Sequence, residues 1–301
     1  MRGIGDGPKM HCLRELIFDC KCSIFLGQET LSRREKVIKT FLSFKEGWNA
    51  AAIDSCGHSG GLVAIWDPGW FNFKAFSFSG GILLSGQMRG MVDTLNIINL
   101  YAPYAGRLSF WTKMRDSGIL RLPNLTLMGD FNITLQADEI WGKEARGDPL
   151  SNFLNDMFFN QQLMDIRPCP MIPTWTNKRR GGKYIGKRLD RALVKDNLID
   201  RWGNPRTLVL VSDVSDHMPI SISWNAWRIM RGVPFKFNRV WLDDDDYTNM
   251  VKTIWNEDVD IDDIQYVDSF HHKLQRVKAA SKKWEIQKKS SLKAELVDIK
   301  Q

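Results

Sequence analysis

The sequence predicts an α+β fold: a four-layer α/β/β/α sandwich of two mainly antiparallel sheets packed face to face between outer helices, followed by a C-terminal helical appendage. Short apolar runs typical of buried strands alternate with amphipathic helical patterns up to residue 224, and the composition changes after Trp224. A chain of 301 residues, 43% of them hydrophobic, can bury a core of this size. We therefore expect one domain over residues 1–224, and a linker with a helical extension over residues 225–301.

The apolar pattern places the elements of the first domain in order. Helical periodicity predicts helices, and short apolar or alternating runs predict strands. The turn-forming residues Gly57 to Gly61 and Pro68-Gly69 mark loops. The predicted helices lie at about 9–20, 31–45, 107–116 and 148–163, and the predicted strands at about 23–27, 61–66, 82–87, 94–100, 125–130 and 207–211.

The C-terminal part has a different character. Residues 228–234 have the composition of a linker, and residues 265–300 are predicted to form a long polar helix. On this helix Leu274, Val277, Ser281 and Trp284 recur about once per turn. So narrow an apolar stripe favours docking onto another element over independent folding. Its lysine-rich flanks fit either a nucleic-acid-binding arm or a solvated connector.

Composition excludes some classes of protein. No apolar run reaches the roughly 18–20 residues needed to span a bilayer, and the first residues lack the apolar core of a signal peptide. The five cysteines lack zinc-type paired spacing and favour reduced thiols. We expect an intracellular monomer, nuclear rather than cytoplasmic, that needs neither a membrane nor a small-molecule cofactor. Its net charge of +7 and pI near 9.1 favour a polyanionic partner.

Four short polar motifs, called signatures below, occur at or near the ends of predicted strands. Carboxylates and an imidazole at such strand ends are expected to converge on one edge of a sheet. Three of the four signatures follow or lie inside apolar runs that read as buried strands. The signatures are Gln28-Glu29-Thr30, Gly129-Asp130-Phe131-Asn132, Leu189-Asp190-Arg191 and Ser215-Asp216-His217.

These residue types suit phosphodiester hydrolysis, in which water attacks an anion and the added negative charge must be stabilised. A hard cation such as Mg²⁺ or Mn²⁺ does this and prefers oxygen ligands, which Glu29, Asp130, Asn132 and Asp216 can supply. The imidazole of His217 can serve as a base or, when protonated, as a stabilising cation. Asp190 would fix the orientation of that ring, as a carboxylate does in a catalytic triad. The set predicts a metal-dependent phosphodiesterase.

Each signature also has a structural explanation. Asp130-Phe131-Asn132 after a strand is typical of an Asx turn. The segment Ser215-Asp216-His217 can cap a loop, and Glu29 can open the next helix. The functional interpretation depends on the signatures occurring together and in order.

Eight stretches in the right order resemble the endonuclease/exonuclease/phosphatase superfamily, the deoxyribonuclease-I-like fold. The resemblance is greatest to the endonuclease domain of plant non-LTR (LINE-type) retrotransposons and covers residues 1 to about 224. It implies a DNA endonuclease that uses Mg²⁺ or Mn²⁺ and leaves a 3′-hydroxyl. The stretches are Leu13-Arg14-Glu15-Leu16-Ile17, Phe25-Leu26-Gly27-Gln28-Glu29-Thr30, Ser59-Gly60-Gly61-Leu62, Asn99-Leu100-Tyr101-Ala102-Pro103, Gly129-Asp130-Phe131-Asn132, Thr174-Trp175-Thr176-Asn177, Arg188-Leu189-Asp190-Arg191 and Ser215-Asp216-His217.

The resemblance also implies a role for each site residue. Glu29 would be the principal metal ligand, and Asp216 a second metal or structural ligand. Tyr101 would contact the phosphate. The pair Asp130 and Asn132 would handle the attacking water and the scissile phosphate, while His217 and Asp190 would form the catalytic pair.

Two departures from the family pattern lead us to expect reduced activity. The family begins with a strand ending in Asn-x-Arg-Gly, of which Arg2-Gly3 remain and Met1 takes the x position, so that strand and its asparagine are expected to be missing. Tyr104 stands where the family commonly has asparagine. Two alternatives therefore stay open: a catalytically weak retroelement remnant that only binds nucleic acid, and a small-molecule phosphoesterase of the same superfamily.

A basic segment lies between two of the signatures. Lys178, Arg179, Arg180 and Lys183 follow Trp175 in a glycine-bearing loop that precedes Asp190. Such a loop can hold the phosphates that flank a cleavage point. The alternative is a solvated hairpin tip.

Overall fold

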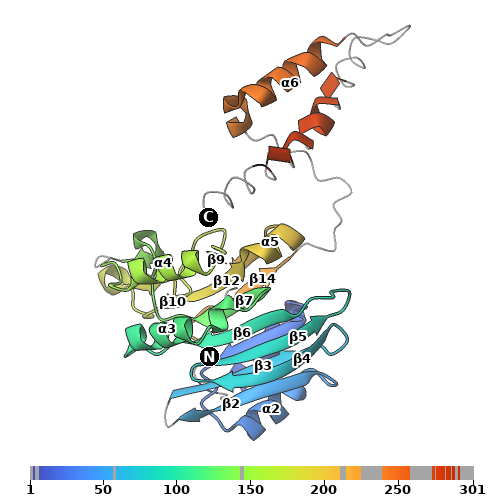
Figure 1. Cartoon of the computed structure of the whole chain (residues 1–301). Coiled ribbons are helices and arrows are strands. Elements are labelled where there is room, and N and C mark those ends of the chain that lie inside the picture. Colours follow the sequence, from blue (N-terminus) through green and yellow to red (C-terminus); the bar gives the residue numbers. More distant parts are fainter. Residues whose placement is uncertain are drawn as a thin grey trace. The chain divides into compact units, whose positions relative to one another are not determined.

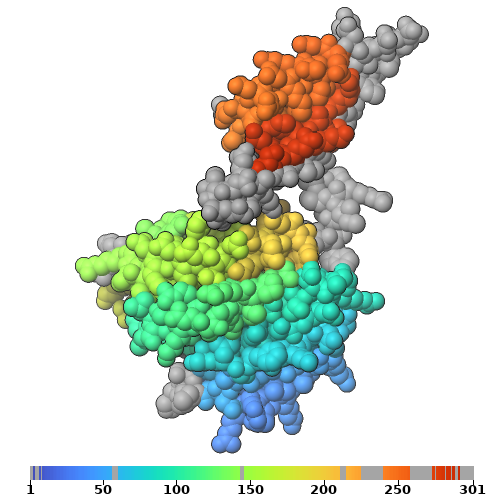
Figure 2. Space-filling model, viewed as in Figure 1, coloured from blue at the N-terminus to red at the C-terminus, as the bar shows by residue number. Residues whose placement is uncertain are grey.

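The computed structural model describes residues 3, 7–56, 59–142, 146–210, 215–224, 239–257 and most of 273–291. The chain divides into two compact units, residues 1–228 and 229–301. The elements of the first unit form one continuous body in the space-filling view (Figure 2). No helix in the described ranges has the length and apolar character needed to cross a membrane.

Two main sheets make up the first unit (Figure 1). The smaller has the order β1-β3-β2 and is antiparallel throughout, with β1 at Ile24–Gln28, β2 at Asn49–Cys56 and β3 at Ser59–Trp66. The larger has the order β4-β5-β6-β7-β12-β9, in which only the β6–β7 pair is parallel. Its strands are β4 (Phe71–Phe78), β5 (Gly81–Met88), β6 (Leu95–Tyr101), β7 (Leu125–Asp130), β9 (Leu163–Asp165) and β12 (Asp190–Lys195).

Alternation along the strands builds the layers, because successive side chains point to opposite faces. Leu62, Ala64 and Trp66 of β3 pack against Ile82 and Leu84 of β5, which forms the core between the sheets. The other face of β3 packs on α1 (Pro8–Asp19) and α2 (Arg34–Leu42) through Val63, Ile65, Ile17, Val37 and Phe41.

The outer face of the larger sheet is covered by α3 (Arg107–Asp116) and α4 (Ser151–Asn160). Leu100 of β6 and Leu127 of β7 lie in one buried cluster with Trp111 of α3 and Phe158 of α4. The layers therefore run helix, sheet, sheet, helix, and the predicted α/β/β/α sandwich is confirmed. The remaining elements of this unit are α5 (Asp196–Trp202), β13 (Arg206–Val209) paired with β14 (Ile220–Ser223), the short strands β8 (Ile140–Trp141), β10 (Trp175–Thr176) and β11 (Gly186–Lys187), and the 3-10 turns Ile119–Arg121, Ala137–Glu139 and Gly181–Lys183.

Most predicted elements lie within a few residues of the observed ones. Two predictions were wrong in part. The helix predicted over 148–163 ends at Asn160, and Leu163 already belongs to β9. Gly60, predicted as loop, lies in β3, as does Gly61, which both the predicted loop and the predicted strand included. Gly61 has φ +83°, and an added Cβ would lie 2.2 Å from Thr30 Oγ1, so both the backbone conformation and the close approach of Thr30 favour glycine there.

A glycine also determines how closely β6 and β7 approach. Gly129 has φ +137°, and a Cβ added there would lie 1.9 Å from Leu100 O. Gly129→Ala is expected to lower the free energy of unfolding by about 3 kcal/mol, because the strands must separate beside Asp130. Gly147→Ala is the matched control, since that position has open space and should change stability by less than about 0.5 kcal/mol. Equal urea midpoints for the two variants would contradict this prediction.

The second unit contains the 3-10 turn Arg239–Asp243 and α6 (Asp245–Asn256), whose N-cap Asp244 accepts hydrogen bonds from two backbone N–H groups. The predicted helix over 265–300 is helical at each of its described residues between 273 and 291. Tyr247 Oη and Ser281 Oγ lie 2.8 Å apart, and the rings of Tyr247 and Trp284 are 4.9 Å apart. Ser281 and Trp284 of the predicted stripe thus dock on α6, beside which their helix lies in Figure 1, whereas Leu274 is exposed. The predicted linker at 228–234 lies outside the described residues.

Candidate active site

Three predicted site residues form a row across the larger sheet. Tyr101 is the last residue of β6, Asp130 the last of β7 and Asp190 the first of β12. Strand register pairs Tyr101 with Asp130 and Asp190 with Asp130. Because β12 runs antiparallel to β7, the beginning of β12 meets the end of β7. Both buried carboxyl groups therefore lie together at the ends of these strands.

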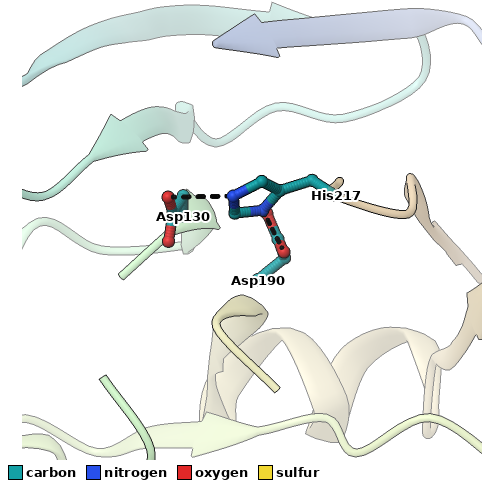
Figure 3. A group of neighbouring side chains, drawn as sticks. All are labelled: Asp130, Asp190 and His217. Atoms are coloured by element: carbon teal, nitrogen blue, oxygen red, sulfur yellow. Dashed lines mark hydrogen bonds and ion pairs between the residues drawn. The ribbon is translucent and has the colours of Figure 1, made fainter. Parts of the chain in front are cut away.

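His217 reaches this row from a different segment. A bridge between Trp175 and His217, and a hydrogen bond from Met218 N to Thr174 O of 2.7 Å, hold its backbone against β10. Its ring lies between two carboxyl groups (Figure 3), with Nδ1 2.9 Å from Asp190 Oδ2 and Nε2 3.9 Å from Asp130 Oδ2. The structure therefore brings together the predicted catalytic pair.

The charges of these groups are coupled. Burial lowers the pKa of His217, but the charge and hydrogen bond of Asp190 outweigh it and raise that pKa to about 9. Burial, followed by repulsion from Asp190, raises the pKa of Asp130 to about 7. At neutral pH the imidazole is therefore mostly protonated, while Asp130 can take up or release a proton.

Glu29 stands beside this group. It follows β1 in a left-handed conformation with φ 56°, and its Oε1 accepts a hydrogen bond of 2.8 Å from Tyr101 Oη. Its charge is near enough to contribute to the raised pKa of Asp130. Glu29 and Tyr101 thus meet across the two sheets, although they lie 72 residues apart in the chain.

Asn132 is held by the loop that follows β7. Asp130 Oδ1 accepts a hydrogen bond from Asn132 N at 2.9 Å, so the predicted Asx turn is present within the site. Asn132 has φ 50°, and its side-chain Nδ2 donates to Ala102 O at 2.6 Å. Arg107 at the start of α3 donates to Asn132 O at 2.8 Å and to Asp148 Oδ2 at 2.5 Å. No sequence motif had indicated a role for Arg107.

Asp216 is placed differently from the other carboxylates. Its Oδ2 accepts a hydrogen bond of 3.3 Å from Trp175 Nε1, and its backbone carbonyl accepts one from Thr176 N. It lines a cavity of about 480 Å³ next to the site, together with Lys9, Trp175, Thr176, Asn177, Lys178, Arg179 and Ser215.

Carboxylate oxygens suited to a divalent cation gather here, whereas the protonated imidazole of His217 is not a ligand. Among the described residues, Asp130, Asp190 and His217 form a group whose ligand atoms all lie within 4.8 Å of one another. The Glu29 carboxylate stands close to Asp130, so several oxygen donors face one region, as hard cations require. Neither Glu29 nor Asp216 belongs to the 4.8 Å group.

The basic segment forms the connection of the β10–β11 hairpin. Asn177 organises it: its Nδ2 donates to Lys183 O at 2.9 Å, and its Oδ1 accepts from Arg179 N and Ile185 N. Residues 178–183 are exposed. Lys178 and Arg179 face the cavity beside Trp175, while Arg180 and Lys183 lie outside its lining.

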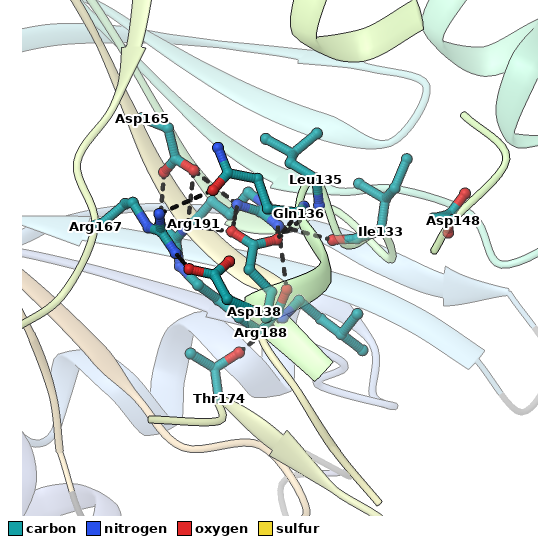
Figure 4. Close-up of polar contacts among 12 residues, drawn as sticks. Ile133, Leu135, Gln136, Asp138, Asp148, Asp165, Arg167, Thr174, Arg188 and Arg191 are labelled. Atoms are coloured by element: carbon teal, nitrogen blue, oxygen red, sulfur yellow. Dashed lines mark hydrogen bonds and ion pairs between the residues drawn. The ribbon is translucent and has the colours of Figure 1, made fainter. Parts of the chain in front are cut away.

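A buried ionic cluster lies next to the site and was missed by sequence analysis (Figure 4). It consists of Arg188, Arg191, Glu139 and Asp165, which we call the arginine cluster. Both arginines were visible in the signature around Asp190. Arginines next to a buried strand need acidic partners, so their presence in the sequence was a signal that such a cluster exists. The sequence did not show which acids are the partners, because the fold decides that.

No family model and no curated protein matches the sequence. Solved structures do match. The endonuclease domain of TRAS1, a telomere-specific non-LTR retrotransposon, superposes with a TM-score of 0.53 at 14% identity, covering 72% of this chain and 92% of that one. An AP endonuclease from Archaeoglobus fulgidus gives 0.56 at 16% identity, with 72% and 94% covered. The catalytic domain of Xenopus laevis APE2 gives 0.57 at 16% identity, with 72% and 88% covered.

The chain therefore has the fold of these endonucleases, and the fold expected from the sequence resemblance is confirmed. The neighbours include both a retrotransposon endonuclease domain and AP endonucleases.

Proposed function

We propose that this protein is an endonuclease that nicks DNA with the help of Mg²⁺ or Mn²⁺. The observation that carries the proposal is the group formed by Asp130, His217 and Asp190, with Glu29 and Tyr101 beside it. A protonated imidazole, a carboxyl group with a pKa of about 7 and further oxygen donors at one sheet edge match what phosphodiester hydrolysis needs.

Each residue has a role in this proposal. Asp130 accepts a proton from the attacking water, and Asn132 orients the scissile phosphate. The His217 imidazolium, held by Asp190, stabilises the added charge on the phosphate oxygens. Glu29 is the principal ligand of the cation, and Asp216 is a second or structural ligand. Tyr101, which donates a hydrogen bond to the Glu29 carboxylate, contacts the phosphate. The bound cation would supply further charge stabilisation.

The exposed hairpin supports DNA as the substrate. Lys178 and Arg179 line the cavity beside Trp175, and Arg180 and Lys183 are exposed in the same loop. Four cations in one exposed loop suit several backbone phosphates better than one small molecule. This arrangement favours the nuclease over a small-molecule phosphoesterase. The third candidate is a remnant that binds DNA without cleaving it. A measurement of DNA cleavage distinguishes this remnant from the nuclease.

A plasmid-nicking assay tests the proposal. Purified protein is expected to convert supercoiled plasmid to the open circle in Mg²⁺ or Mn²⁺ and to stop when EDTA is added. The nick should carry a 3′-hydroxyl, which a DNA polymerase can extend directly. Binding without nicking would support the remnant, and phosphate release from inositol phosphates without nicking would support the phosphoesterase.

Neutralising two cations of the hairpin is expected to weaken DNA binding. Arg179→Gln with Arg180→Gln should lower affinity to a similar extent for unrelated sequences, because phosphate contacts carry no sequence information. The slope of log K against log salt should fall by about 0.9 for each lost contact. Fluorescence anisotropy over a salt series measures both, and Arg33→Gln with Arg34→Gln at the start of α2 is a control of equal charge. A sequence-selective loss would indicate base readout, and an unchanged slope would leave the hairpin as a solvated tip.

A further inference from the structure

The arginine cluster is closed to solvent over most of its atoms. The side chains of Arg188, Arg191 and Glu139 are at most 1% exposed, and that of Asp165 is 20% exposed. Two positive and two negative charges balance. Burial acts to raise the pKa of Glu139, but the hydrogen bond and charge of Arg191 outweigh it and lower that pKa to about 2, so the carboxylate stays ionised at neutral pH.

The contacts within the cluster are shared between the two arginines. Arg188 places Nη1 2.8 Å from Glu139 Oε1 and Nη2 2.6 Å from Asp165 Oδ1. Arg191 places Nη1 2.7 Å from Asp165 Oδ2, and its Nη2 binds Glu139 Oε2. Each acid therefore bridges both guanidinium groups, and a planar guanidinium fixes the direction of each contact.

Stability alone explains such a cluster poorly. Burying charges is costly, and well-packed apolar residues of similar volume often give equal or greater stability. Moreover, Nε of both Arg188 and Arg191 lacks a hydrogen-bond partner among the described residues, which adds to the cost. What apolar residues would not provide is a fixed geometry between the segments that the cluster joins.

Those segments carry the active-site residues. Arg191 Nη2 donates to Ile133 O at 3.2 Å and to Arg188 O at 3.3 Å, and Glu139 Oε2 accepts from Leu135 N at 2.6 Å. Ile133 directly follows Asn132 in the loop after Asp130, and Arg188 and Arg191 flank Asp190. Since successive strand residues point to opposite faces, Arg191 is anchored on the side away from the Asp190 carboxylate.

We propose that the arginine cluster is a positioning unit that holds Asp190 and the loop bearing Asp130 and Asn132 in the arrangement that cleavage needs. Its catalytic part rests on the proposed nuclease function. The cluster touches no reacting atom and acts through the residues that it holds.

Two variants remove part of the cluster, and one serves as a control. Glu139→Gln weakens contacts with both arginines at the buried centre. Asp165→Asn weakens contacts with both arginines at the partly exposed side of the cluster, where water can replace the lost contacts. If Glu139→Gln does not fold, the test is made with Asp165→Asn alone. The control is Arg167→Ala, which removes the exposed contacts of Arg167 with Asp138 at 2.5 Å and with Gln136 at 2.9 Å but none of the ion pairs within the cluster.

The kinetic test compares kcat with KM at a temperature where circular dichroism shows each protein folded. Both cluster variants are expected to lower kcat for nicking at least about 10-fold with little change in KM, whereas Arg167→Ala should match the wild type. In an Asp190→Asn background the cluster variants should lower kcat by a much smaller factor, because part of their effect on kcat is exerted through Asp190. An unchanged kcat in folded variants, or an equal loss in both backgrounds, would overturn the proposal.

A spectroscopic test needs no turnover. The proton shared by His217 Nδ1 and Asp190 should give a downfield NMR signal, assigned by its loss in His217→Ala. This signal should shift or broaden in the cluster variants and persist in Arg167→Ala. If it moves while no form of the protein nicks DNA, the positioning role stands and the nuclease function fails. If it stays unchanged in folded cluster variants, the positioning role is wrong.

Discussion

Replacing His217 with alanine is expected to lower the rate of metal-dependent nicking by at least about 100-fold, the usual scale for loss of a positioned catalytic group. The reason is electrostatic: the imidazole between Asp130 and Asp190 is mostly protonated at neutral pH and supplies a positive charge where negative charge develops. Single-turnover nicking with saturating protein measures the effect. His11→Ala, on the exposed surface of α1, is the matched control and should keep the wild-type rate.

Asp190→Asn should act through the same ring. It removes the charge that holds Nδ1 at 2.9 Å, so the imidazole loses both its orientation and its preference for the protonated form. The double variant with His217→Ala is therefore expected to lose much less than the product of the two single losses. Fully multiplicative losses would show that Asp190 acts independently of His217, and wild-type nicking in His217→Ala would remove the ring from the mechanism.

Glu29→Gln is expected to lower the nicking rate by a similar factor, at least about 100-fold at a fixed Mg²⁺ concentration. The amide has the same shape as the carboxylate but lacks the charge that attracts a cation. The hydrogen bond from Tyr101 Oη at 2.8 Å can persist to the amide oxygen, so the effect isolates the charge. Raising Mg²⁺ should recover part of the rate if the defect is in metal binding.

Direct metal binding separates the outcomes for Glu29. Titration of Mn²⁺, followed by its electron paramagnetic resonance signal, should show weaker binding in Glu29→Gln. Glu35→Gln on the exposed face of α2 is the control and should bind as the wild type does. Equal Mn²⁺ affinity and equal nicking in the two variants would contradict the assignment of Glu29 as the principal ligand.

The sequence by itself predicted the fold class and the outline of the site. Short apolar runs in β3 and β6 identified buried strands, because each face of these strands packs on a different layer and both faces therefore carry apolar side chains. Asp130, Asp190 and His217 were found because each belongs to a short polar signature, and two of them lie at the edge of a buried strand. Local sequence carries that information.

Other strands gave weaker signals. Phe71–Phe78 of β4 has several exposed side chains, and Asn49–Cys56 of β2 is rich in alanine, so neither shows a strong apolar pattern. Their place in the sheets is decided by pairing with β5 and β3, which is a non-local interaction.

Only the tertiary structure decided which polar groups meet. Register pairs Asp190 with Asp130, the packing of two sheets brings Tyr101 to Glu29, and burial together with neighbouring charges raises the pKa of His217 to about 9. The partners of Arg188 and Arg191 come from residues 139 and 165, up to 52 positions away. A residue's type, which the sequence shows, determines what chemistry it can perform. Its partners and charge state depend on distances and solvent exclusion, which arise only when segments distant in the chain pack together.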